Sequence, residues 1–199
     1  SSLAFMVQKI TWVDDTLTRQ KVDSKVNYEL YNNNRFSFTT SYNLKLNATV
    51  NFKAGVYVNL LDYKFNKGEW NYLNNSYKAN VIAGEGNSWL LQPYVQFSIK
   101  PTSKLLINPG VHSMYFALNK QFVADPRLSI QYRFSAKSNL TLAYGLHSKL
   151  LPLGSYFYQS GSALPNLNLK MMRSNHYIIA YDQLLGNRWR FHAEAYHQQ

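Results

Sequence analysis

The chain contains no cysteine. Disulfide frameworks, thiolate metal sites and cysteine nucleophiles are therefore excluded. The lack of cysteine does not indicate whether the protein resides in an oxidising or a reducing compartment. No apolar run reaches the roughly 18 residues that a transmembrane helix needs, and the mean hydropathy is -0.35. These features exclude a transmembrane helix. They do not exclude a transmembrane β-barrel, because barrel strands are only half apolar and hydropathy windows miss them.

Acidic residues are scarce: 10 Asp and Glu stand against 21 Lys and Arg, which gives a formal net charge of +11. Such a balance suits nucleic acid, an anionic membrane surface or an acidic ligand. The basic residues are scattered singly, as at Lys45, Lys78 and Arg133, whereas proteins that bind nucleic-acid grooves concentrate charge on one element. We therefore expect no nucleic-acid partner.

Helical periodicity is nearly absent, and alternation of apolar and polar residues recurs from end to end. Each alternating segment is near the length with which a tilted strand crosses a bilayer. The pattern predicts an all-β fold, an antiparallel meander of about nine strands. The predicted strands lie at 3–13, 36–44, 48–60, 89–99, 105–115, 127–134, 140–146, 177–181 and 189–195.

The predicted connections differ in length at the two ends of the strands. Short turns at 45–47, 101–103, 135–138 and 185–187 alternate with long polar loops at 14–35, 62–88 and 147–172, and a link of middling length spans 119–126. Outer-membrane barrels have this asymmetry, with short periplasmic turns and long outer loops. Aromatic residues at strand ends, such as Tyr42, Trp89 and Trp189, fit the girdles at the two membrane interfaces.

Three local features interrupt the pattern. Pro93 and Pro109 fall inside predicted strands, where each removes a hydrogen-bond donor, and this predicts a sheet edge or a bulge. The sequence Gly84-Glu85-Gly86 lacks the flanking strand and helix of a phosphate-binding loop, so we expect a flexible loop tip.

Alternation alone does not say which face of the sheet meets water. In a soluble β-barrel or sandwich the apolar face lines an interior that could bind an apolar small molecule. In an outer-membrane barrel the apolar face meets lipid and the polar face lines the lumen. A small closed porin-like barrel is a third alternative, and it would need a closing strand.

The most distinctive stretch runs from Asp125 to Ser148, DPRLSIQYRFSAKSNLTLAYGLHS, followed by Leu151-Pro-Leu153 and Tyr156-Phe157. It resembles the late barrel of TonB-dependent outer-membrane receptors, of the Bacteroidota kind that carries a carboxypeptidase-regulatory-like domain ahead of its plug. In that family a Pro-Arg opens a strand, a Lys-Ser or Asn turn follows, and Ala-Tyr-Gly leads into an outer loop. The resemblance extends over 89–199.

The resemblance implies a receptor and transporter in the cell outer membrane, surrounded by lipid. Such a receptor takes up a small, scarce nutrient, for example a siderophore or a glycan, and an energising TonB-type partner acts on it through a plug. Neither a plug nor a closing strand with its terminal aromatic is found here, and both ends of the sequence look cut. We therefore expect residues 1–199 to form a single β-barrel segment.

Arg127, Gln131, Arg133 and His147 are the predicted lumen-facing residues, as candidates for contact with ligand or plug. His192 and Glu194 lie on one strand face and are expected to form a hydrogen-bonded pair. We predict no metal site, because three or four converging ligands are needed. No nucleophile elbow surrounds Ser155 or Ser160. The chain is accordingly expected to be a non-enzyme without a cofactor.

Overall fold

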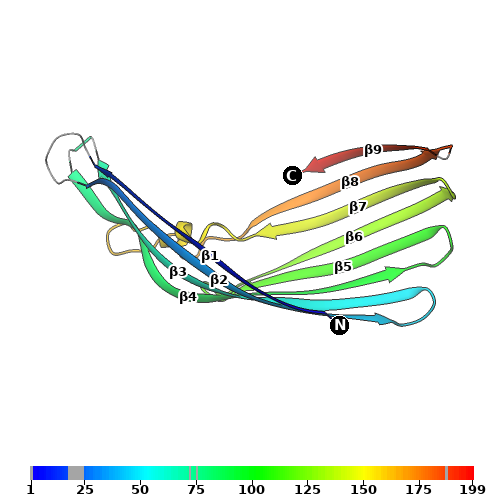
Figure 1. Ribbon diagram of the computed structural model, residues 1–199, viewed down its shortest axis with the longest axis horizontal. Helices are drawn as coiled ribbons and strands as arrows, with labels where there is room; N and C mark the ends of the chain where they lie inside the picture. Colours follow the sequence, from blue (N-terminus) through cyan, green and yellow to red (C-terminus); the bar gives the residue numbers. More distant parts are fainter. Residues whose placement is uncertain (1, 18–24, 72, 75, 187) are drawn as a thin grey trace.

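The protein is all-β, and its nine strands form one antiparallel sheet in sequence order in the computed structural model (Figure 1). The structure describes residues 2–17, 25–71, 73–74, 76–186 and 188–199, with residues up to 28 described by their backbone alone. The predicted meander of about nine strands is confirmed. The strands are β1 (Ser2–Leu17), β2 (Lys25–Lys45), β3 (Val50–Asn71), β4 (Ser76–Ile99), β5 (Leu105–Phe116), β6 (Gln121–Ser135), β7 (Ser138–Lys149), β8 (Met172–Leu185) and β9 (Trp189–Gln198).

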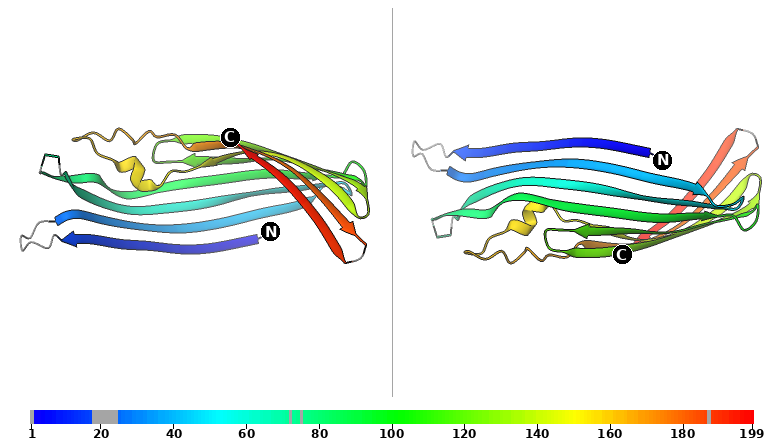
Figure 2. Two further views of the ribbon diagram at one scale, coloured as in Figure 1. Left: turned by 90° about the horizontal axis from the view of Figure 1, so that it is seen from above. Right: turned by 90° about the horizontal axis from the view of Figure 1, so that it is seen from below.

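The sheet is curved and open (Figures 1 and 2). Each strand pairs with its neighbours in sequence, and within the described strands β1 and β9 do not pair with each other. The single described helix is η1 (Leu153–Phe157), a 3-10 turn between β7 and β8. A small closed barrel would need a β1–β9 ladder, so the described strands do not form one.

The register keeps the alternating side chains in phase from β2 to β9 among the residues whose side chains are described. Phe38 pairs with Val58, Val58 with Leu91 and Leu91 with Tyr115, so four apolar residues lie side by side across β2 to β5. We call this side of the sheet the apolar face and the opposite side the polar face. Side chains of the apolar face are widely exposed: Phe38 is 40% exposed, Leu142 47% and Ile179 48%.

The prediction of a long loop is wrong for two of the three segments. Most of residues 62–88 belong to the hairpin of β3 and β4, which are 22 and 24 residues long. Likewise, the described part of 14–35 belongs to β1 and β2, while residues 18–24 lie outside the described residues. Only the third loop is largely a loop, because β7 ends at Lys149 and β8 begins at Met172.

The apolar alternation changes phase inside β3, and this change concealed the strand extensions. Up to Leu60 the apolar residues are even-numbered. Beyond it they are odd-numbered, and Leu61, Tyr63 and Phe65 are buried on the polar side of the sheet. The other side of the extension carries Lys64, which forms a 2.8 Å ion pair with Glu85.

The segment 150–171, which we call the strap, covers the buried residues of this extension. Phe157 of η1 packs on Tyr63, with ring centroids 4.7 Å apart, and on Phe65 at 5.7 Å. Tyr156 packs edge-on against Phe116 at 5.5 Å. The hydrophobic core therefore lies between the strap and one end of the polar face. It comprises Leu61, Tyr63, Phe65, Leu90, Met114, Phe116, Val123, Tyr156, Phe157 and Met171.

Gly84 lies within β4 and allows the strap to approach closely. A Cβ atom built on Gly84 would lie 2.4 Å from Cδ1 of Phe157, which is too close for any side chain. The prediction of a loop tip at Gly84-Glu85-Gly86 is therefore wrong. These glycines are strand residues, and Gly84 leaves space for an aromatic ring from the strap.

The two prolines lie in central strands, so the prediction of a sheet edge is wrong for both. The β4–β5 ladder pairs Leu91 with Tyr115 and next pairs Tyr94 with His112, which skips Pro93. It skips Pro109 in the same way, and the register does not shift at either site. Each proline therefore interrupts the ladder without a bulge, as expected for a residue that lacks an N–H donor.

The short connections agree with the sequence-based expectation. Asn47 organises the β2–β3 turn, since its Oδ1 accepts 2.8 Å hydrogen bonds from the backbone N–H groups of Thr49 and Val50. Gly186 has a φ of 64° in the β8–β9 turn, a conformation that suits glycine. The link predicted at 119–126 is shorter than expected, because β6 already begins at Gln121.

Candidate functional site: a cationic hollow on the polar face

A continuous row of paired residues crosses the middle of the polar face. The pairing between neighbouring strands places these residues opposite one another, and it therefore determines the order of the side chains along the row. From β3 to β9 the row reads Lys53, Gln96, Gly110, Arg127, Gly145, His176 and Gln198.

Arg127 stands between two glycines in this row. A Cβ atom on Gly110 would lie 3.0 Å from the carbonyl oxygen of Val95, and one on Gly145 would lie 2.8 Å from Nε2 of His147. The same Cβ on Gly145 would lie 3.6 Å from Cγ of Arg127. The glycine on either side of Arg127 therefore allows a close approach, of the His147 imidazole at Gly145 and of the Val95 carbonyl at Gly110.

Arg127 and the two glycines line a hollow of about 620 Å³. Lys53, Arg127, His112, His147 and His176 are among its lining residues, and no Asp or Glu lines it. Within the described part of the chain, neither Lys53 nor Arg127 has a carboxylate within ion-pair distance. The lining of this concave surface consequently carries an excess of positive charge.

Aromatic rings and a histidine pair form the two sides of the hollow. On one side, the rings of Tyr57 and Tyr94 lie 5.7 Å apart, and Nζ of Lys53 lies 5.9 Å from the centre of the Tyr94 ring. On the other side, the rings of His147 and His176 lie 4.3 Å apart. Nδ1 of His176 is 2.9 Å from the hydroxyl of Tyr196, which fixes the orientation of that imidazole.

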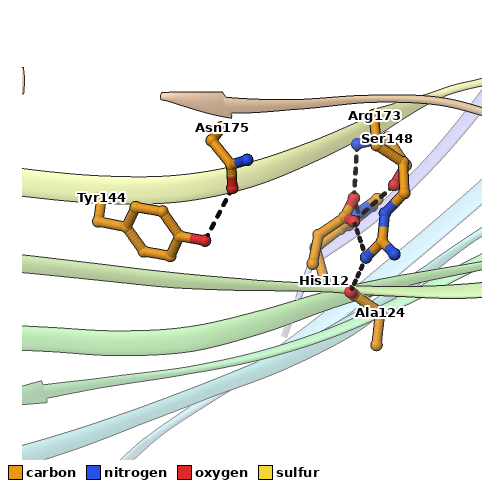
Figure 3. A network of polar contacts seen from close by, with 7 residues as sticks. His112, Ala124, Tyr144, Ser148, Arg173 and Asn175 are labelled. Atoms are coloured by element: carbon orange, nitrogen blue, oxygen red, sulfur yellow. Dashed lines mark hydrogen bonds and ion pairs between the residues drawn. The ribbon is translucent and has the colours of Figure 1, made fainter. Parts of the chain in front are cut away.

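A buried carboxylate lies next to the hollow. Asp125 is fully buried, at 0% exposed. Its two oxygens accept hydrogen bonds from the N–H of Ser148 at 2.8 Å and from the Ser148 hydroxyl at 2.6 Å (Figure 3). Nη2 of Arg173 lies 3.8 Å from Asp125 and donates a 3.0 Å hydrogen bond to the Ala124 carbonyl.

The interactions of Asp125 join four strands. Asp125 belongs to β6, Ser148 to β7 and Arg173 to β8. Nδ1 of His112 on β5 lies 3.9 Å from Asp125, within ion-pair range but beyond hydrogen-bond range, and among the described residues that buried nitrogen has no hydrogen-bond partner. The carboxylate therefore lies near Arg173 and His112, and not within ion-pair distance of Arg127 or Lys53.

The structure divides the four predicted site residues between two places. Arg127 and His147 both line the hollow. Gln131 and Arg133 line a second depression beside the β4–β5 turn, and Nε2 of Gln131 donates a 3.0 Å hydrogen bond to Asn139. The predicted set is therefore not one cluster, although all four residues lie on the polar face.

Sequence reasoning missed Lys53, Tyr94, His112 and His176 as parts of this site. They belong to four different strands, and only the register brings them together. The available signal was the pair Gly110 and Gly145, since glycine inside a strand often marks a place where something must approach the backbone closely.

The predicted hydrogen-bonded pair of His192 and Glu194 is wrong in its geometry. Nε2 of His192 is 3.7 Å from Glu194, too long for a hydrogen bond, while its Nδ1 is 3.1 Å from Asp182. Asp182 also accepts a 2.8 Å hydrogen bond from Nε of Arg190. Among the described residues, no three His, Asp or Glu side chains form a group that could hold a metal ion.

No helix in the described ranges is both long and apolar enough to cross a membrane. No protein-family model matches the sequence, and a search of curated proteins also found no match.

Proposed function

We propose that the chain is a β-barrel segment of a TonB-dependent outer-membrane receptor, in which the apolar face meets lipid and the polar face lines the lumen. The receptor would import a small, scarce nutrient with the help of an energising TonB-type partner. The observation that carries the proposal is the bare apolar face, which runs across the sheet with no covering layer among the described residues.

A water-soluble sheet buries its apolar face, because exposed apolar area is unfavourable in water. Here the arrangement is the opposite. The strap packs on the polar side of the sheet, and Phe36, Leu142 and Ile179 on the apolar side are each more than 40% exposed. A soluble sandwich that binds an apolar molecule would need these residues to line its interior, so the arrangement favours the membrane barrel.

The apolar face also has a boundary at the strap end of the sheet. Along β3 it runs to Leu60 and is followed by Asp62, Lys64 and Asn66. On the neighbouring strand, Asn34 donates a 2.9 Å hydrogen bond to Asp62. A polar surface that starts abruptly on the same side of the same strand is expected where a strand leaves the hydrocarbon layer.

Aromatic side chains stand at both limits of this apolar face. Trp89 and Phe36 lie at the strap end, beside the start of the polar surface. Phe134, Trp189 and Phe191 lie beside the short turns at the other end, and each is at least half exposed. Two aromatic girdles of this kind anchor barrels at the membrane interfaces. The family resemblance of residues 125–148 then favours a receptor over other barrels.

Two adjacent isoleucines of β8 provide a matched test. Ile178 lies on the polar face and lines the hollow, whereas Ile179 lies on the apolar face. We would introduce Ile178→Cys and Ile179→Cys singly, attach a nitroxide label and reconstitute the intact protein in lipid vesicles. We expect oxygen, which concentrates in lipid, to relax the label at position 179, and a water-soluble nickel complex to relax the label at 178.

The outcome that would overturn the proposal is a label at 179 that the nickel complex relaxes as strongly as the label at 178. A label at 179 that neither reagent reaches would also overturn it, because that result would mean that another protein layer covers the apolar face.

A further inference from the structure

We infer that the hollow binds a ligand bearing more than one oxyanion group, with Arg127 as the principal anchor and Lys53 as a second cation. The inference deepens the proposed function, on which it rests in treating the polar face as a lumen wall, and it names the chemical class of the ligand. Carboxylate, phosphate and sulfate groups share the relevant chemistry.

The hollow brings together two cations with no acidic side chain in its lining. Among the described residues, neither Arg127 nor Lys53 has a carboxylate within ion-pair distance, whereas Lys67 pairs with Glu29 at 2.5 Å. Asp125 lies only two positions from Arg127, but it is buried and within ion-pair distance of Arg173 and His112. An anion from outside the chain would complement the charges of Arg127 and Lys53.

Arg127 borders a space large enough for an anion. A planar guanidinium binds carboxylate, phosphate and sulfate through two parallel hydrogen bonds, which requires room for the anion in front of the fork. The hollow of about 620 Å³ that Arg127 lines provides room, and its neighbours in the row, Gly110 and Gly145, add no side chain to the lining. The concave surface also excludes part of the solvent, which strengthens the electrostatic attraction.

The distance between the two cations indicates the size of the ligand. Lys53 on β3 and Arg127 on β6 are three strands apart, which corresponds to about 14 Å between their backbones. Both side chains line the hollow, and Gln96 lies in the same row as a hydrogen-bonding amide. A ligand with two or more acidic groups can bind both cations, whereas a single small anion would satisfy only one.

The test uses the intact protein in detergent micelles, in a buffer free of multivalent anions, with isothermal titration calorimetry. The probes are citrate, inorganic pyrophosphate and sulfate, which separate carboxylate, phosphate and sulfate recognition. We expect at least one probe to bind, Arg127→Gln to weaken that binding at least tenfold, and Arg127→Lys to weaken it less, because lysine retains the charge without the fork.

Arg133→Gln is the matched control. It removes the same charge from the same face of the same strand, but Arg133 lines the second depression and not the hollow. Gly145→Ala leaves the charge unchanged but adds a Cβ atom 2.8 Å from Nε2 of His147, which must shift within the hollow, so it should weaken binding as Arg127→Gln does. Far-UV circular dichroism in the same detergent would establish that each variant retains its β-sheet.

Two results would overturn the inference. One is the absence of binding by all three probes at millimolar concentration, which would leave a protein segment such as a plug as the occupant of the hollow. The other is equal weakening by Arg127→Gln and Arg133→Gln, which would indicate diffuse attraction to the net charge. Neither result would affect the proposed function, because the nitroxide test depends on Ile178 and Ile179 in vesicles and involves no ligand.

Discussion

The two faces of this sheet carry similar aromatic residues in opposite settings. Phe157 of the strap is buried against Tyr63 and Phe65 on the polar face, while Phe134 on the apolar face is 52% exposed. The apolar face of the sheet is uncovered among the described residues, and the hydrophobic core lies at one end of the polar face. Alternation thus specifies the two faces of a sheet but not the environment of either.

The polar face is itself divided into two regions. Its strap end is buried, and this burial raises the pKa of the Tyr156 hydroxyl above its ordinary value. Its middle is the open hollow around Arg127. We expect changes at the strap end to affect stability and changes in the hollow to affect binding.

The largest expected effect comes from Phe157→Ala. The substitution removes the ring that packs on Tyr63 and Phe65 and occupies the space above Gly84, so we expect it to destabilise the strap by about 3–5 kcal/mol. Hydrogen exchange of the backbone amides in η1 would measure this loss. Phe134→Ala removes the same ring from the bare face and should cost about 1 kcal/mol or less. Equal costs would contradict the difference between the two faces.

Asp125→Ala should have the next largest effect. It leaves the N–H and hydroxyl of the half-buried Ser148 without their acceptor, which costs about 3 kcal/mol. Denaturant unfolding in detergent would measure the change. Asp125→Asn keeps an acceptor oxygen and should recover part of the loss. If Asp125→Asn and Asp125→Ala were equally destabilising, the negative charge, and not the hydrogen bonding to Ser148, would be the important feature.

A smaller effect is expected from the ion pair of Lys67 and Glu29, in the extension beyond the apolar face. The hydrogen bond from Lys67 to Glu29 raises the pKa of Lys67 above its ordinary value of 10.5. A raised pKa in the folded state stabilises the protein fully below the unfolded-state pKa, and this contribution is lost as the pH rises through the folded-state pKa. Because the pair is partly exposed, it contributes about 1 kcal/mol or less.

The change to make is Lys67→Met, followed by unfolding measurements between pH 8 and about 11.5. The wild-type protein should lose its advantage over the variant only at the alkaline end of this range. A difference that stayed constant throughout the range would mean that the methylene groups of Lys67, and not its charge, provide the stabilisation.

The sequence predicted the all-β class, the strand number and the short turns, because alternation over 36–44 and 48–60 and turn residues such as Asn47 are local signals. It failed where the environment of a strand changes along its length. Beyond Leu60 the apolar residues move to the opposite face to pack against the strap, so the alternation loses its phase. A strand that extends from one environment into another then resembles a polar loop.

The hollow could be predicted only in part. Arg127 and His147 were identified because they lie in one recognisable hairpin, but their neighbours Lys53 and His176 come from β3 and β8. Grouping them requires the register across six strands, and that register is determined by pairing between residues far apart in the sequence. The same lack of register information placed Gln131 and Arg133 in the candidate set, although they line a different depression.

The central claim, that the apolar face meets lipid, is tested most directly by adding a charge on each face of β8. We would measure the free energy of unfolding of Ile178→Lys and Ile179→Lys from lipid vesicles. The account predicts a cost of about 2–4 kcal/mol at Ile179, which faces hydrocarbon, and a much smaller cost at Ile178, which faces the aqueous hollow. A cost at Ile179 no larger than that at Ile178 would contradict the account, because a lysine at a half-exposed position in water is tolerated.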